Sequence, residues 1–157
     1  MAIPALESAA VTHPVSDATD TTADPLAPAV ARGALWREAY LACTPVLTSD
    51  VVAQRLGGLS PAALRHRVRR RTILSLPLGT ERVFPAWQFL DGDRVVPGLA
   101  RVRRALATES DWVFAGQLDG LRDPNSAAPR TLRELLLAGD VAAAVRAAAT
   151  HADGGGA

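Results

Sequence analysis

The sequence predicts a mainly α-helical protein, in which a helix-turn-helix with a short β-hairpin wing precedes a small helical domain. Aromatic residues make up only 4% of the 157 residues, which limits the size of any core and favours small helical units. In several stretches after residue 32, apolar residues recur at spacings of three and four, as they do in amphipathic helices. A third observation is an alternating stretch around a glycine, at residues 73–84, which is typical of a hairpin.

The first 31 residues are predicted to form a disordered acidic tail. Their centre, VTHPVSDATDTTADPLAPAV, has no aromatic residue and no periodic apolar stripe, so it cannot bury enough surface to offset the entropy of ordering. We expect the first helix to begin at Gly33 and to end before Pro45. Its expected apolar stripe comprises Leu35, Trp36, Ala39, Tyr40 and Cys43.

The next stretch, LTSDVVAQRLGGLSPAALRHRV, is typical of a helix-turn-helix. Thr48 or Ser49 can cap a first helix, which a double glycine ends. Ser60 can cap a second helix that starts with Pro61, where the missing N–H costs nothing. The alternating stretch ILSLPL-GT-ERVF then predicts a wing. These features together resemble the excisionase-like and MerR-like DNA binders, in which the second helix enters the major groove.

Positive charge is concentrated in the middle of the chain. Residues 45–105 hold eleven arginines and four acidic residues, a net charge of +7, although the whole chain carries only +1. The stretch LRHRVRRR contains five arginines without an acidic residue, which indicates a surface for a polyanion. The alternative is that these arginines form an ordinary solvated helix face. All 17 basic residues of the chain are arginine, as codon bias in a GC-rich bacterial genome favours, so the number of arginines alone does not indicate a binding surface. The predicted DNA-binding residues are Ser60, Arg65, His66, Arg67, Arg69, Arg70, Arg71 and Arg82.

The second half of the chain carries an ordered series of short motifs: WQF, a DG turn, VVPGL, DW and TLRELL-x-AGD-x-x-x-x-V. This series resembles the antitoxins of the Xre/MbcA/ParS group over roughly residues 85–150. The resemblance implies a C-terminal domain that neutralises a co-encoded toxin, commonly a RES-domain protein that consumes NAD, and autoregulation of the operon through DNA binding. The residues expected to bind the toxin are Trp112, Leu135, Leu136, Gly139, Asp140 and Val145.

Four regions are therefore expected. They are an acidic tail (1–31), a DNA-binding region with the wing (32–90), a helical toxin-binding domain (91–150) and a flexible tail (151–157). The expected core of the second half comprises Trp87, Phe89, Leu99, Val102, Leu106, Trp112, Leu118, Leu132, Leu135, Leu136, Val141 and Val145.

Other function classes find little support in the sequence. The histidines and the single cysteine are scattered, and there is no phosphate-cradling glycine loop, so neither catalysis nor a cofactor or metal is expected. Without a signal peptide or an apolar run of membrane-spanning length, we expect a cytoplasmic protein that forms homodimers on operator DNA. The alternatives are a stand-alone transcription regulator and a protein-binding adaptor whose arginine face meets an acidic partner.

Overall fold

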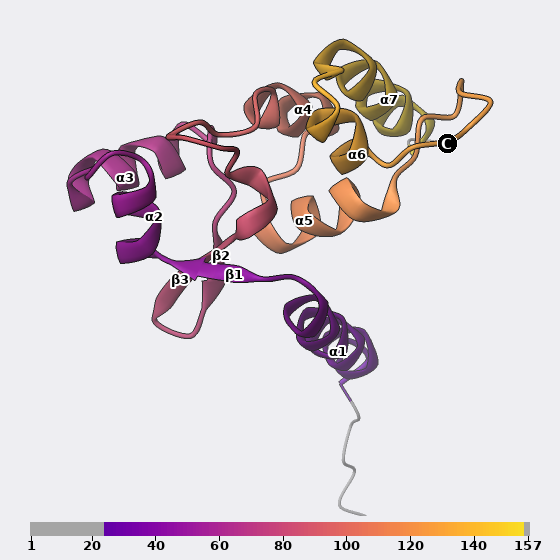
Figure 1. Ribbon diagram of the computed structural model, residues 1–157. Helices are drawn as coiled ribbons and strands as arrows, with labels where there is room; N and C mark the ends of the chain where they lie inside the picture. Colours follow the sequence, from indigo (N-terminus) through magenta and orange to yellow (C-terminus); the bar gives the residue numbers. More distant parts are fainter. Residues whose placement is uncertain (1–23, 156–157) are drawn as a thin grey trace, which may run out of the picture.

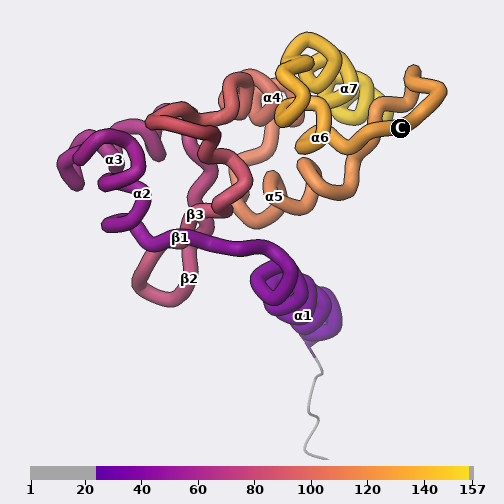
Figure 2. The backbone as a smooth tube through the Cα atoms, in the orientation of Figure 1, coloured from indigo at the N-terminus to yellow at the C-terminus, as the bar shows by residue number. Residues whose placement is uncertain are grey.

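A computed structural model describes residues 24–155 and shows a mainly helical chain with a small antiparallel sheet (Figure 1). The helices are α1 (Ala27–Cys43), α2 (Ser49–Arg55), α3 (Pro61–Arg69), α4 (Leu99–Leu106), α5 (Asp111–Gly120), α6 (Leu132–Leu137) and α7 (Val141–Gly154), with a 3-10 turn, η1, at Ala86–Gln88. The strands are β1 (Val46–Thr48), β2 (Leu76–Leu78) and β3 (Glu81–Pro85). Helices α2 and α3 lie at one end, α6 and α7 at the other, and α1 projects from the middle (Figures 1 and 2). This arrangement confirms the predicted fold class.

The wing forms as the sequence predicts, and it belongs to a three-stranded sheet of order β1-β3-β2. Strands β2 and β3 are joined by a two-residue loop, in which Gly79 adopts a left-handed φ of 61°. That conformation suits a tight hairpin and favours glycine. Strand β1 was not predicted; it pairs with β3 so that Thr48 lies opposite Val83. The sheet thus connects the wing to the start of α2.

Both helices of the helix-turn-helix begin at the predicted caps. The Thr48 hydroxyl accepts the Val51 N–H at 3.4 Å, and the Ser60 hydroxyl accepts the Ala63 N–H at 3.1 Å. A side-chain oxygen at this position satisfies one of the free amides in the first helical turn. The starts of α2 and α3 are therefore set by local sequence.

Helix α1 corrects two predictions. It begins at Ala27 rather than at Gly33, because the Asp24 side chain and carbonyl accept the first amides of the turn, both at 2.9 Å. Residues 24–26 and the start of α1 therefore fall within the region expected to be tail, and residues 1–23 lie outside the described part. The expected stripe is also wrong in part: Tyr40 is buried, whereas Leu35 is 65% exposed and Cys43 is exposed.

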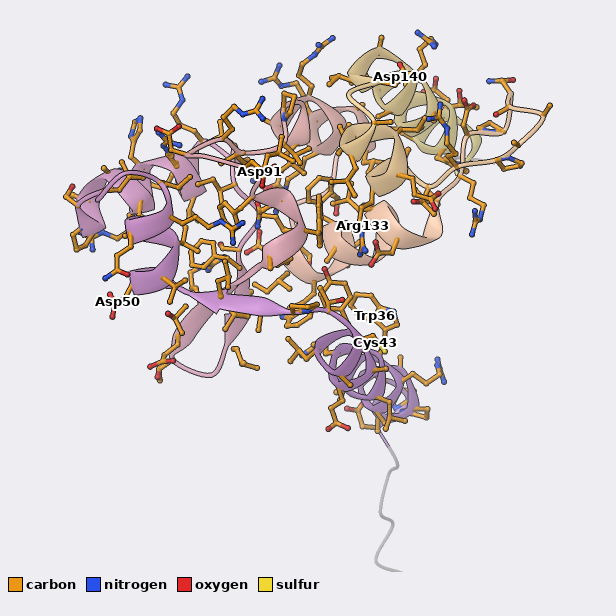
Figure 3. All side chains as sticks on the ribbon, viewed as in Figure 1. Trp36, Cys43, Asp50, Asp91, Arg133 and Asp140 are labelled. Carbon is orange, nitrogen blue, oxygen red and sulfur yellow. The ribbon has the colours of Figure 1, made fainter. Side chains whose placement is uncertain are left out.

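Trp36 and Tyr40 attach α1 to the rest of the protein. Trp36 lies at the junction between α1 and the body (Figure 3), where its ring meets Trp112 edge-on with 6.1 Å between the ring centroids. Tyr40 meets Trp112 in the same way at 6.0 Å. A Cβ at Gly116 of α5 would lie 3.2 Å from the Trp36 ring, so the close packing depends on that glycine. Burial raises the pKa of the Tyr40 hydroxyl.

The buried side chains form two cores. The smaller core joins the helix-turn-helix to the sheet and comprises Val52, Leu56, Leu64, Ile73, Phe84 and Phe89. The larger core joins α4, α5, α6 and α7, and it also contains Tyr40 of α1 and Leu74 and Leu76 from the wing side. Phe89, expected in the larger core, belongs to the smaller one. Trp87, Trp112, Val141 and Val145 are only partly buried against the larger core.

Candidate nucleic-acid interface

Helix α3 turns one face inward and presents the rest to solvent. Leu64 is buried in the smaller core and Val68 packs against it. With 100° between successive residues, Arg65 and Arg69 then share one flank of the helix, and His66 and Arg70 lie on its outer face. All three of these arginines are exposed, as is His66. The basic side chains of α3 are thus open to solvent.

A groove of about 990 Å³ runs between α3 and the wing. Arg65 and Arg69 line it from α3, while Thr80 and Arg82 line it from the hairpin. The start of α2, from Thr48 to Asp50, forms part of the same wall. Basic side chains therefore face the space between the second helix of the motif and the wing, together with the carboxylates of Asp50, Glu81, Glu109 and Asp111. Arg65 and Arg69 are the arginines of this lining that no carboxylate holds within residues 24–155. Arg67 is half-buried on the opposite flank of α3 and does not line the groove, and Ser60 is exposed at the N-terminus of α3.

Two of the predicted DNA-binding arginines are held by carboxylates. Arg71 forms an ion pair with Glu109, so the expectation that the arginine run has no acidic residue within reach is wrong at this position. Arg71 also lies beyond α3, with a left-handed φ of 59°. Arg82 bonds the Ser75 hydroxyl at 2.8 Å and pairs with Asp111. Neither guanidinium is freely available to a phosphate in this arrangement.

The pair between Arg71 and Glu109 shifts both groups towards their charged forms. The hydrogen bond from Arg71 holds the pKa of the Glu109 carboxyl below its ordinary value, and the same bond raises the pKa of Arg71. Charge stabilisation by an opposite charge at hydrogen-bond distance is the cause in both cases. The basic surface of α3 is thus partly neutralised at its C-terminal end.

Arg103 and Asp111 form the buried part of this polar cluster. Arg103, with a side chain only 6% exposed, donates to Asp111 at 2.7 Å and to the Thr108 carbonyl at 3.2 Å. It also donates to the carbonyl of Glu109. Asp119, on the same helix as Asp111, binds a different arginine, Arg133, at 3.0 Å. Burial raises the pKa of Asp119.

The residues expected to bind a toxin divide into two groups. Leu135 and Leu136 are each 1% exposed, so the expectation that they contact a partner is wrong; they fill the larger core. Trp112 is half-buried and donates to the Pro77 carbonyl at 3.1 Å, which ties α5 to the wing, and Val145 packs against the core.

Gly139 and Asp140 do lie exposed, between α6 and α7. Gly139 has a left-handed φ of 78°, and Asp140 caps α7 by accepting the Ala143 N–H at 3.1 Å. Sequence reasoning missed the neighbouring Leu137, which is 44% exposed although it belongs to the apolar TLRELLL stretch. Its place at the end of a short helix, where the inward face has rotated past it, explains the exposure.

Within residues 24–155, no group of three His, Cys, Asp or Glu side chains is arranged to hold a metal ion. Over the same part of the chain, none of the helices has both the length and the apolar character that crossing a bilayer requires. Comparison with protein-family models, with curated proteins and with solved structures gave no match to this chain. The resemblance to the Xre/MbcA/ParS antitoxins stays a prediction.

Proposed function

We propose that this protein binds double-stranded DNA through α3 and the wing and acts as a transcription regulator. The observation that carries the proposal is the solvent side of α3, where Arg65, Arg69 and Arg70 are exposed and where Arg65 and Arg69 line the groove that leads to the wing. A capped helix that packs on a partner helix and keeps its basic side free is the arrangement that enters the major groove.

The charges on α3 support a polyanion as the ligand. Within the described part of the chain, none of Arg65, Arg69 and Arg70 has a carboxylate partner. Arg65 and Arg69 are four positions apart, so like charges repel along the helix. Phosphates relieve this repulsion, and guanidinium groups bind them bidentately. A solvated face would not require so many unpaired arginines on one helix.

The direct experiment is a binding measurement with the DNA upstream of the gene. The variant Arg65→Ala/Arg69→Ala/Arg70→Ala removes three charges from α3. A control variant, Arg32→Ala/Arg122→Ala/Arg146→Ala, removes three exposed arginines outside the basic block. We expect the α3 variant to lose at least tenfold in affinity, because each phosphate or base contact contributes about 1 kcal/mol or more. Equal affinity of the two variants would contradict the proposal and favour a protein-binding adaptor.

Toxin neutralisation is the second candidate function, and it rests on the resemblance and on one surface. Leu137 is an exposed large apolar side chain next to the exposed Gly139 and Asp140. Co-expression with the product of the neighbouring gene tests it: the intact protein should restore growth, and Leu137→Asp should not. Failure of the intact protein to protect cells would leave a plain transcription regulator.

We place this function in the cytoplasm, where the DNA is, and expect a homodimer that reads two half-sites. Helix α1 offers a surface for self-association, because Leu26, Val30 and Leu35 are each 64–65% exposed. Leu26 and Val30 lie one turn apart and Leu35 lies on another side of the helix, so more than one side of α1 offers an apolar contact to a second chain. Sedimentation of the protein with Val30→Asp and Leu35→Asp should show a monomer where the parent shows a dimer. A monomeric parent would overturn this expectation.

A further inference from the structure

Helix α4 carries two free arginines on its outer side. Its buried residues, Leu99, Val102, Arg103 and Leu106, face the larger core and the polar cluster. Arg101 and Arg104 are exposed on the other side, three positions apart. Among residues 24–155, neither of their side chains makes a hydrogen bond or an ion pair. Residues at this spacing are neighbours on a helix surface.

A small cleft of about 190 Å³ joins this side of α4 to the end of α3. Its lining residues are Arg70, Arg71, Ala100, Arg103, Arg104, Ala107, Thr108 and Glu109. Arg71 and Arg103 are already engaged, with Glu109 and with Asp111 and two carbonyls respectively. The free guanidinium groups in the cleft are therefore those of Arg70, from the end of α3, and Arg104, from α4.

The chemistry of the cleft selects the kind of ligand. Alanine is the only apolar residue type in its lining, so it lacks the large apolar anchor that protein partners use. Two unpaired guanidinium groups instead match the oxygens of a phosphate. Nitrogen-tipped side chains project along the edge of the molecule that runs from α3 to α4 (Figure 3). A duplex seated on α3 would have its backbone close to this edge.

We propose that the cleft between α3 and α4 binds a backbone phosphate of the duplex that α3 reads, through Arg70 and Arg104, and that Arg101 contacts a neighbouring phosphate. This inference rests on the proposed DNA binding and extends it to a helix outside the helix-turn-helix. Contacts of this kind fix the position of the protein on the duplex without reading its sequence.

The test uses the full chain with Arg101→Ala/Arg104→Ala, and Arg32→Ala/Arg146→Ala as a control that removes the same charge from exposed sites on α1 and α7. The slope of log affinity against log salt should fall by about 1.8 units in the α4 variant, since each phosphate contact adds about 0.9. Affinity for operator and for unrelated duplex should fall by the same factor, because phosphates carry no sequence information. The variant Arg104→Lys, which keeps the charge and the helix, should retain most of the slope.

The outcomes separate this inference from the proposed function. A parent protein that fails to bind duplex at low salt overturns both. If the parent binds duplex but the α4 variant has the same slope of log affinity against log salt as the control, only the assignment of the cleft is overturned. Inorganic phosphate, compared with chloride at equal ionic strength, should compete with the duplex better for the parent than for the Arg104→Ala variant, because the cleft offers the same guanidinium groups to either ligand. Such competition, combined with an α4 variant whose salt slope equals that of the control, would assign the cleft to a small free anion and would overturn its assignment to the DNA backbone.

Discussion

Arg82 of the wing forms an ion pair with Asp111, the first residue of α5. The same carboxylate accepts a hydrogen bond from Arg103 at 2.7 Å, which fixes it against α4. The wing is therefore held by the helical domain as well as by the sheet. Its position beside α3, and with it the width of the groove, depends on residues far along the chain.

Replacing Asp111 should destabilise the protein more than replacing Arg82. Asp111→Asn removes the charge that faces Arg103, whose side chain is 6% exposed, and should cost about 1–3 kcal/mol of unfolding free energy. Arg82 is 41% exposed, so Arg82→Ala should cost less than about 1 kcal/mol. Urea denaturation of the two variants measures the difference. An equal loss in both would mean that Asp111 does not stabilise Arg103.

Glu109→Gln should strengthen DNA binding at neutral pH. The substitution removes a negative charge from the edge of the groove and frees Arg71, which can then add up to about 0.9 units to the salt slope. A variant that binds no better than the parent would show that Arg71 does not reach the DNA.

The same pair predicts a dependence of stability on pH. The folded pKa of Glu109 is lowered by Arg71, so the pair stabilises the fold above the ordinary pKa of about 4.3 and loses this effect as the pH falls through the lower folded value. The difference in melting temperature between the parent and Glu109→Gln should therefore shrink below about pH 4. A difference that stays constant down to pH 3 would argue against the ion pair.

Local signals in the sequence were sufficient for α3 and the hairpin. Ser60-Pro61 sets the start of α3, and Gly79 sets the turn of the wing. Strand β1 has only three residues and forms because β3 lies beside it, which no local pattern indicates. The early start of α1 escaped prediction because the first half of this helix is exposed and carries no periodic apolar stripe.

The candidate site was predictable only in part, because some of its contacts join residues that lie far apart in the sequence. Charge density points to the arginines of α3, because their number and spacing are visible in the sequence. The partners of Arg71 and Arg82 lie 38 and 29 residues away, so only the folded chain brings them together. Leu135 and Leu136 belong to the apolar motif TLRELL, yet packing against α7 and the core buries them.

Gln88 should be one of the most sensitive positions in the wing region. Its fully buried side chain accepts the Leu74 N–H and donates to the Leu74 carbonyl, both at 2.7 Å. Gln88→Leu leaves these backbone groups without a partner and should cost about 2–4 kcal/mol. Gln117→Leu is the control, since the buried Gln117 Oε1 has no hydrogen-bond partner among residues 24–155, and it should be nearly neutral. If urea denaturation showed that Gln88→Leu and Gln117→Leu lose similar amounts of unfolding free energy, the role of the Gln88 hydrogen bonds would be contradicted.

Two glycines should differ in their tolerance of alanine. Gly98 has a φ of 98°, and a Cβ there would lie 2.6 Å from Val141 Cγ1, so Gly98→Ala combines strain with a clash and should cost about 2–4 kcal/mol. Gly139 has a φ of 78° but open space around it, so Gly139→Ala should cost about 1–2 kcal/mol. Thermal unfolding of both variants gives the comparison. The reverse order would show that α7 is not fitted against Gly98.

The most direct test of the account is the salt dependence of DNA binding by the parent and by Arg65→Ala/Arg69→Ala/Arg70→Ala, measured by fluorescence anisotropy on a duplex from the upstream region. If these arginines lie on the duplex, the parent should bind with a steep slope of log affinity against log salt. The variant should have a slope smaller by about 2.7 units, at 0.9 per phosphate contact, while the Arg32, Arg122 and Arg146 control keeps the parent's slope. A parent that does not bind at low salt, or an α3 variant with the control's slope, would contradict DNA recognition by α3.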